Sequence, residues 1–230
     1  MVKHGIILHN HLINACCKKT IIFTYQLKIN FMFLKKLTIL LTLFCFYLVT
    51  NAQTKSIYPE GLKVGDKAPI FSAKNQDGKE IELKKLLKKG EVVILFYRGQ
   101  WCPYCNLQLK KMNDSLKFIY AKGATVLAIT PETAENVQKT IEKTKVTFSI
   151  IKDENLAIMK SYKVNFSVDE STIAKYKTYG IDFDKANGSN SSNLPVPATY
   201  IIGKDGKIKY AFFDVNYTKR ASVKDIIDHL

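Results

Sequence analysis

The central part of the chain carries two short apolar runs with a segment of helical spacing between them. The runs are Glu91–Tyr97 and Ala124–Thr130, and both are typical of strands that are buried on both faces. Between them, apolar residues recur at helical intervals as far as Gly123, which is a common helix stop. These residues are Leu109, Met112, Leu116 and Ile119. The pattern predicts a helix over residues 103–122.

The remaining apolar positions continue this alternation to the end of the chain. The expected helices are 81–89, 133–142, 155–162 and 222–230, and the expected strands are 147–151, 198–202 and 208–213, the last two joined as a hairpin. Strands that alternate with helices predict an α/β domain with helices on both faces of one sheet.

Residues 164–195 interrupt the alternation. They hold few apolar runs, a short helical segment at 171–179 and a Ser- and Asn-rich end at 187–193. A stretch of this length inside a domain is typical of a surface insertion, and we expect its Ser/Asn end to be mobile. The insertion leads into Val196-Pro197, an X-Pro bond at the mouth of the strand 198–202, where a cis peptide can be fixed by its surroundings.

The amino-terminal region has the order of a secretory signal peptide. Lys35 and Lys36 precede an apolar run at 37–50, and Ala52 supplies a small residue before a plausible cleavage position. The run has about 14 residues, fewer than the roughly 20 that a membrane-spanning helix needs. We therefore expect a signal peptide at 32–52 and an exported protein, periplasmic or extracellular. A membrane anchor that is not cleaved is the alternative.

Residues 1–31 fit no part of this order. They precede a complete signal sequence, so we interpret Met32 as the true start and residues 1–31 as a doubtful upstream segment. His9, His11, Cys16 and Cys17 fall in this segment, and we discount them as a metal cluster. If cleavage follows Ala52, residues 53–230 form one domain, which is long enough for one proper core and too short for two.

The charge is basic but says little about partners. The whole chain has a formal net charge of +15, and because six lysines and no acidic residue precede Gln53, residues 53–230 carry a net charge of +9. Nearly all of this charge is lysine, since Arg98 and Arg220 are the only arginines. Surfaces that bind nucleic acid usually combine arginine stripes with aromatic platforms. No such stripe occurs in the sequence, and we expect no nucleic-acid partner.

Cys102 and Cys105 are the only cysteines of residues 53–230, and they follow the first apolar run directly. A thiol between a core strand and the start of a helix meets free backbone N–H groups and the positive end of the helix dipole, which both favour the thiolate. A disulfide between residues so close in the sequence would constrain the unfolded chain little and so add little stability. The motif therefore indicates a redox-active dithiol that forms a Cys102–Cys105 disulfide. Half of a zinc site is the alternative, but two further ligands are lacking, and we expect no metal.

The segments FYRGQWCPYC and LPVPATYIIGKDGKI, with the earlier VGDKAPIF, resemble the thioredoxin superfamily. More narrowly, residues 60–230 are similar to peroxiredoxin-like proteins of the alkyl hydroperoxide reductase and thiol-specific antioxidant family. The resemblance implies a thioredoxin-like fold, with a central mixed sheet, helices on both faces and Cys102 exposed at the start of its helix. It also implies that Val196-Pro197 is cis and that Pro197 packs opposite the cysteines.

Two positions depart from the family pattern. Gly99 stands three residues before Cys102, where a Thr or Ser usually orients the peroxide, and Pro197 stands where an Arg is common. Arg98 and Arg220 are the candidates that could replace these polar groups, and we expect Trp101 to shield the sulfur.

The resemblance implies a thiol peroxidase that needs no cofactor. Cys102 would attack a hydroperoxide as the thiolate, and Cys105 would condense with the sulfenic acid to form a disulfide. A thioredoxin-type dithiol would then reduce that disulfide. Secreted disulfide reductases share the same motifs, so a protein-disulfide reductase in which Cys102 attacks and Cys105 resolves is the main alternative. A binding module with an inert dithiol, which docks a partner through the insertion 164–195, is the third.

Overall fold

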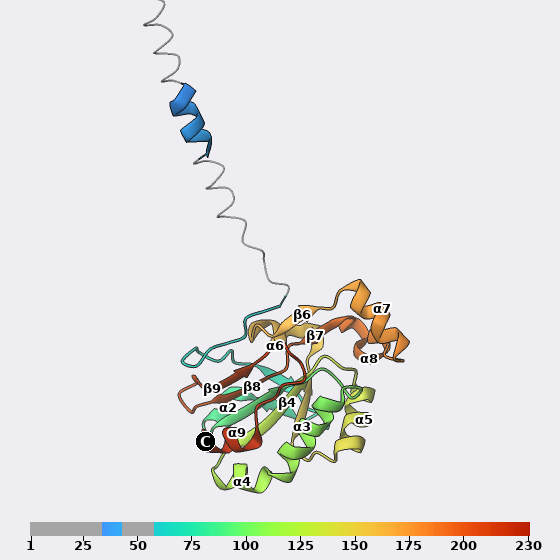
Figure 1. Cartoon of the computed structure of the whole chain (residues 1–230). Helices are drawn as coiled ribbons and strands as arrows, with labels where there is room; N and C mark the ends of the chain where they lie inside the picture. Colours follow the sequence, from blue (N-terminus) through green and yellow to red (C-terminus); the bar gives the residue numbers. More distant parts are fainter. Residues whose placement is uncertain (1–33, 43–57) are drawn as a thin grey trace, which may run out of the picture. The chain divides into compact units, whose positions relative to one another are not determined.

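A mixed five-stranded sheet forms the centre of the domain (Figure 1). The computed structural model describes residues 34–42 and 58–230. The sheet consists of β3 (Val92–Phe96), β4 (Thr125–Thr130), β5 (Ser149–Lys152), β8 (Ala198–Ile202) and β9 (Ile208–Phe213), in the order β5-β4-β3-β8-β9. β3, β4 and β5 are parallel, whereas β8 is antiparallel to both β3 and β9. The predicted α/β class and mixed sheet are confirmed.

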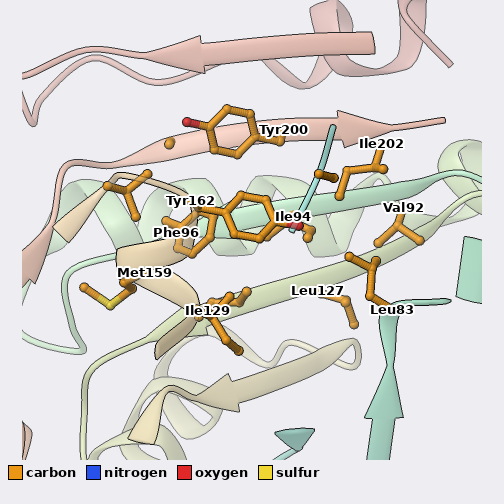
Figure 2. Packing of buried hydrophobic residues seen from close by; sticks show 14 of the residues in the cluster. Leu83, Val92, Ile94, Phe96, Leu127, Ile129, Met159, Tyr162, Tyr200 and Ile202 are labelled. Carbon is orange, nitrogen blue, oxygen red and sulfur yellow. The ribbon is translucent and has the colours of Figure 1, made fainter. Parts of the chain in front are cut away.

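One face of the sheet carries a core of large apolar side chains (Figure 2). Val92, Ile94 and Phe96 alternate on this face of β3, because successive strand residues point to opposite sides. They pack against side chains from α2 (Leu83–Leu87), α6 (Ala157–Ser161) and the neighbouring strands, among them Leu83, Met159, Tyr162 and Tyr200. The residues of this cluster are fully or almost fully buried.

The opposite face of the sheet positions the two cysteines. Val93, Leu95 and Tyr97 point to this side and pack against α3 (Pro103–Asp114), α4 (Leu116–Ala121), α5 (Ala134–Thr144) and α9 (Val223–Asp228). Cys102 and Cys105 belong to the same cluster. The dithiol is thus part of the packed core rather than an attachment to its surface.

The predicted helix 103–122 is two helices. Ser115, with φ −106° and ψ 2°, ends α3 and precedes α4. The apolar positions keep facing the sheet across this break, since Met112 and Leu116 are both buried in the same cluster. The spacing of apolar residues therefore could not show the break. The other predicted elements are confirmed with boundaries shifted by a few residues at most, apart from the strand β2 (Glu80–Glu82), which pairs with β1 (Ser72–Lys74) at the start of the expected helix 81–89.

The predicted insertion forms its own small layer. It contains β6 (Asn165–Ser167), α7 (Glu170–Thr178), α8 (Phe183–Asn187) and β7 (Asn193–Pro195), and β6 pairs with β7. The Ser/Asn end, which was expected to be mobile, is held by hydrogen bonds in the structure. The amide of Asn190 is buried and donates to the carbonyls of Pro131 (2.8 Å) and Asp153 (3.0 Å), which fixes the segment on the end of the main sheet.

The amino-terminal part of the chain forms a separate unit, residues 1–55, from the domain at 56–230. Residues 34–42 form a helix whose side chains are exposed. The expected upstream segment, the end of the apolar run and the cleavage position lie outside the described residues. Within the part of the chain that the structure describes, no helix is long and apolar enough to cross a membrane.

Candidate active site

The two cysteines lie where β3 ends and α3 begins. Cys102 is the N-cap residue of α3, Pro103 occupies the first turn, and Cys105 lies within that turn. Pro at this position begins a helix readily because its missing N–H would have had no partner there. The backbone N–H of Cys105 donates to the carbonyl of Cys102 (3.1 Å), which closes the turn. The predicted placement of Cys102 at the start of a helix is confirmed.

Neither sulfur is exposed, which corrects the expectation of an exposed Cys102. Cys102 is 1% exposed and Cys105 is 0% exposed, and both are free thiols in this structure. Both sulfurs lie in the buried cluster on this face of the sheet, against which Trp101 packs. The sequence analysis expected the shielding by Trp101 but not the further layer of Tyr176 and Phe183, which lie far along the chain and pack on the indole.

The two thiols share a hydrogen bond, and their pKa values move in opposite directions. That bond and burial raise the pKa of Cys102. Burial also favours the neutral form of Cys105, but the hydrogen bond from Cys102 and the charge of Arg220 outweigh it and lower the pKa of Cys105 to about 6. The expectation that Cys102 carries the lowered pKa is therefore wrong. The hydrogen bond between the two thiols is the largest cause of the difference, and the charge of Arg220 acts on Cys105 in the same direction.

Arg220 reaches the dithiol from the loop between β9 and α9. Its Nη2 lies 3.3 Å from the Sγ of Cys105. Its Nη1 donates to the carbonyls of Tyr217 and Lys219, which hold the guanidinium in place. Arg220 was predicted as a supporting residue, and the structure brings it into contact with Cys105.

Arg98 lies in a cage of aromatic rings. Its guanidinium carbon is 4.3 Å from the ring centroid of Tyr217, 5.0 Å from that of Trp101 and 5.4 Å from that of Tyr176. Its Nη2 donates to the hydroxyl of Tyr176 at 2.5 Å. The side chain is only 4% exposed, and its backbone N–H donates to the sulfur of Cys105. The charge of Arg98 thus favours the Cys102 thiolate, and its backbone N–H favours that of Cys105.

The insertion supplies the cover over Trp101. Tyr176 of α7 and Phe183 of α8 pack edge-on against the indole, with ring centroids 5.4 Å and 5.8 Å away. The predicted shielding role of Trp101 agrees with this geometry, because the indole belongs both to the cysteine cluster and to the core of the insertion.

Pro197 differs from its expected conformation. The Val196–Pro197 peptide bond is trans, which corrects the expected cis bond. Val196 donates its N–H to the carbonyl of Val164, and β8 begins at Ala198, so the chain runs extended between two paired segments and makes no turn that a cis bond would serve. Pro197 lines a cavity of about 120 Å³ together with Arg98, Tyr176 and Tyr217.

Glu132 is a site residue that the sequence analysis missed. It is 0% exposed, and its Oε1 accepts the backbone N–H of Gln100 (2.7 Å), directly before the dithiol motif. Its Oε2 accepts the hydroxyl of Thr140 at 3.4 Å. Burial raises the pKa of Glu132 to about 8, and the charge on Cys105 acts in the same direction. The sequence signal that could have identified Glu132 is its position directly after the buried strand β4, beside the end of β3.

Within residues 34–42 and 58–230, no three His, Cys, Asp or Glu side chains gather as metal ligands would. The histidines and cysteines at 9–17 lie outside these ranges.

Comparison with known proteins places the domain. A model of the AhpC/TSA family matches residues 64–211. The putative peroxiredoxin bcp of Helicobacter pylori is 32% identical over 157 residues, which are 68% of this chain and 91% of that protein. The thiol-disulfide oxidoreductase ResA of Bacillus cereus is 27% identical over 150 residues, which are 65% of this chain and 69% of that protein.

Solved structures support the same fold. The peroxidoxin BcpB of Mycobacterium tuberculosis superposes with a TM-score of 0.57 at 17% identity, over 73% of this chain and 96% of that one. A peroxiredoxin-like protein of Aquifex aeolicus superposes with a TM-score of 0.55 at 20% identity, over 74% and 86%. The thioredoxin-like fold is thereby confirmed, and the family match with the 32% identical relative shows that this chain belongs to the AhpC/TSA family of peroxiredoxin-like proteins.

Proposed function

We propose that the protein is an exported thiol peroxidase that reduces hydroperoxides with the Cys102–Cys105 dithiol. The observation that carries the proposal is the pair itself: two hydrogen-bonded thiols, buried together, with Arg220 in contact with the Cys105 sulfur and the charge of Arg98 acting on Cys102. Peroxide reduction needs a stabilised thiolate and positive groups that can stabilise the oxygen anion formed as the O–O bond breaks. Both are present.

The proposed cycle is balanced in atoms and electrons. A thiolate of the pair attacks one peroxide oxygen, an S–O bond forms, the O–O bond breaks, and the departing oxygen takes a proton to leave as an alcohol or water. The second thiol attacks the resulting sulfenic acid, a disulfide forms, and water departs. A thioredoxin-type dithiol then reduces the disulfide by thiol–disulfide exchange. No step requires a metal or an organic cofactor.

The two arginines stand in for groups that the family pattern would place elsewhere. Gly99 and Pro197 provide no side-chain donor, whereas Arg220 brings a guanidinium into contact with Cys105 and the charge of Arg98 favours the Cys102 thiolate. Their Nε atoms, and the Nη1 of Arg98, are buried without a hydrogen-bond partner among the described residues.

A protein-disulfide reductase is the second candidate, and the similarity to ResA favours it. It would use the same two cysteines without peroxide. The burial of both sulfurs favours the peroxidase, because a hydroperoxide is much smaller than a protein disulfide and needs a smaller opening to reach a sulfur. A binding module with an inert dithiol explains neither the lowered pKa of Cys105 nor the Arg220 guanidinium in contact with it.

Two assays on one preparation test the proposal. The first follows NADPH consumption with thioredoxin, thioredoxin reductase and hydrogen peroxide or cumene hydroperoxide. The second follows reduction of insulin disulfides. The peroxidase predicts turnover in the first assay that is abolished when either cysteine is serine, and insulin reduction no faster than with dithiothreitol alone. Rapid insulin reduction without peroxide turnover would establish the reductase, and inactivity in both assays would favour the binding module.

A further inference from the structure

The surroundings of the two sulfurs differ in a way that assigns their roles. The Sγ of Cys105 lies 3.3 Å from the Nη2 of Arg220, and the thiol of Cys102 and the backbone N–H of Arg98 also favour its thiolate. The backbone N–H of Cys105 favours the Cys102 thiolate in turn. The Arg98 guanidinium favours the Cys102 thiolate, but the shared hydrogen bond and burial outweigh it. Each donor to a sulfur stabilises a negative charge there.

We propose that Cys105 is the thiol that attacks the hydroperoxide, that Arg220 positions it as the thiolate, and that Cys102 is the resolving thiol. This assignment rests on the proposed function and reverses the roles expected from the sequence.

The loop that carries Arg220 also offers an approach to the sulfur. Arg220 lines a cavity of about 340 Å³ together with Tyr104, Gln108 and Thr218, and the same guanidinium touches Cys105. Its Nε is buried and has no partner among the residues that the structure describes. A hydroperoxide that enters this cavity contacts the residue whose guanidinium lies against the sulfur.

The chemistry then runs from Cys105 to Cys102. The Cys105 thiolate attacks the terminal peroxide oxygen, the O–O bond breaks, and the alkoxide takes a proton from solvent in the cavity. Cys105 becomes a sulfenic acid and is oxidised, while the peroxide is reduced. Cys102 is already hydrogen-bonded to Cys105, so its sulfur attacks the sulfenic acid with little movement, and hydroxide departs with the thiol proton as water.

Single-cysteine variants test the assignment. Cys102→Ser and Cys105→Ser are reduced and mixed with one equivalent of cumene hydroperoxide in a stopped-flow instrument, with dimedone present to trap sulfenic acid. We expect Cys102→Ser to consume peroxide within about tenfold of the wild-type rate and to carry dimedone on Cys105. We expect Cys105→Ser to be slower by at least about 100-fold, the size of effect that follows loss of a transition-state group.

Arg220 is tested by the ionisation of the thiol. Thiolate absorbance is titrated in the Cys102→Ser protein and in the same protein with Arg220→Lys or Arg220→Gln added. The other ionisable groups around Cys105, namely Arg98, Glu132 and Tyr97, stay unchanged. Arg220→Gln should move the titration midpoint to higher pH and slow the peroxide reaction at pH 6–7, and Arg220→Lys should recover part of both.

Lys219→Gln is the matched control. It removes one positive charge from the same loop, but its side chain pairs with Asp214 at the surface. We expect the thiol titration and the peroxide rate to be unchanged in this variant. A shift equal to that of Arg220→Gln would show a general charge effect and overturn the role of Arg220.

The outcomes separate this inference from the proposed function. A fast wild type with an active Cys105→Ser and an inactive Cys102→Ser would overturn the inference and leave the peroxidase intact. A wild type no faster than free cysteine would remove both. In case a serine variant unfolds, wild type is also treated with substoichiometric peroxide and excess dimedone, and peptide mass spectrometry should find the first adduct on Cys105. An adduct on Cys102 would overturn the assignment.

Discussion

The Nη2 of Arg220 lies 3.3 Å from the Sγ of Cys105, although 115 residues separate the two in the sequence. This contact joins the loop after the last strand to the first turn of α3. It gives one of two otherwise similar thiols a positively charged neighbour, and the peroxide chemistry proposed for the site depends on that asymmetry.

The pH dependence of the peroxide reaction follows from the lowered pKa of Cys105. Since that pKa is about 6, the rate constant should rise as pH increases through about 6 and level off near neutrality. A free thiol, with a pKa of about 8.5, should still be gaining rate at pH 8. Stopped-flow measurements of the reduced protein and of free cysteine between pH 5 and 9 compare the two profiles. A protein profile that follows that of free cysteine would show that neither thiol is activated.

Glu132→Gln should change how stability depends on pH. The pKa of Glu132 is raised from 4.5 to about 8, so the folded protein holds this proton more tightly than the unfolded chain. The protonated carboxyl therefore contributes its full stability below about pH 4.5. As pH rises from there to about 8, the free energy of unfolding falls by at most about 1.4 kcal/mol per pH unit. In the Glu132→Gln variant, this loss of stability with rising pH should be absent.

Denaturant unfolding of wild type and Glu132→Gln at several pH values between 5 and 9 checks the sign. The variant should become more stable relative to wild type as pH rises, because other titrating groups are common to both proteins. A difference that stays constant across this range would mean that Glu132 titrates normally in the fold.

Gly99→Ala should damage the site by crowding. A Cβ at this position would lie 2.5 Å from the Nε1 of Trp101 and 2.8 Å from the Oε1 of Glu132. One of these side chains must move, and we expect a loss of about 1–3 kcal/mol in unfolding free energy together with a slower peroxide reaction. Gly206→Ala is the control, because it strains a left-handed turn residue with no atom within 4 Å, in the β8–β9 turn. That variant should lose stability and keep the wild-type rate; equal rates in both variants would contradict the crowding argument.

The amino-terminal segment makes a prediction about processing. Lys35 and Lys36, the apolar run 37–50 and Ala52 have the order of a cleaved signal. In a host with a general secretion pathway, the protein should be exported and begin at Gln53, as determined by amino-terminal sequencing. Membrane-bound protein that keeps residues 37–50 would establish an anchor instead.

The pattern of apolar residues predicted most of the fold, because the central strands are short, nearly continuous apolar runs in the sequence. β3 and β4 could be read from Glu91–Tyr97 and Ala124–Thr130, and the β8–β9 hairpin from its runs and Gly-containing turn. The break at Ser115 could not be read, since the buried positions on its two sides keep the same spacing.

The dithiol could be predicted from the sequence, but the burial of its sulfurs and the difference between their two pKa values could not. The C-x-x-C motif after a core strand identifies Cys102 and Cys105, and the same local reasoning favours the first thiol because it is nearest to the start of the helix. In the structure, contacts with residues far along the chain contribute to the different surroundings of the two thiols. Tyr176 and Phe183 of the insertion cover Trp101, and Arg220 approaches Cys105 from the end of the chain. The spacing of residues within the motif does not predict these contacts.

One single-turnover experiment tests whether this dithiol reacts rapidly with peroxide, as we propose. The reduced wild-type protein is mixed with one equivalent of cumene hydroperoxide at pH 7 in a stopped-flow instrument, and the product is analysed by peptide mass spectrometry. The account predicts a rate constant at least about 100-fold above that of free cysteine, corrected for its thiolate fraction, since positioned donors typically contribute effects of this size. It also predicts one Cys102–Cys105 disulfide for each peroxide consumed. A corrected rate equal to that of free cysteine would contradict it.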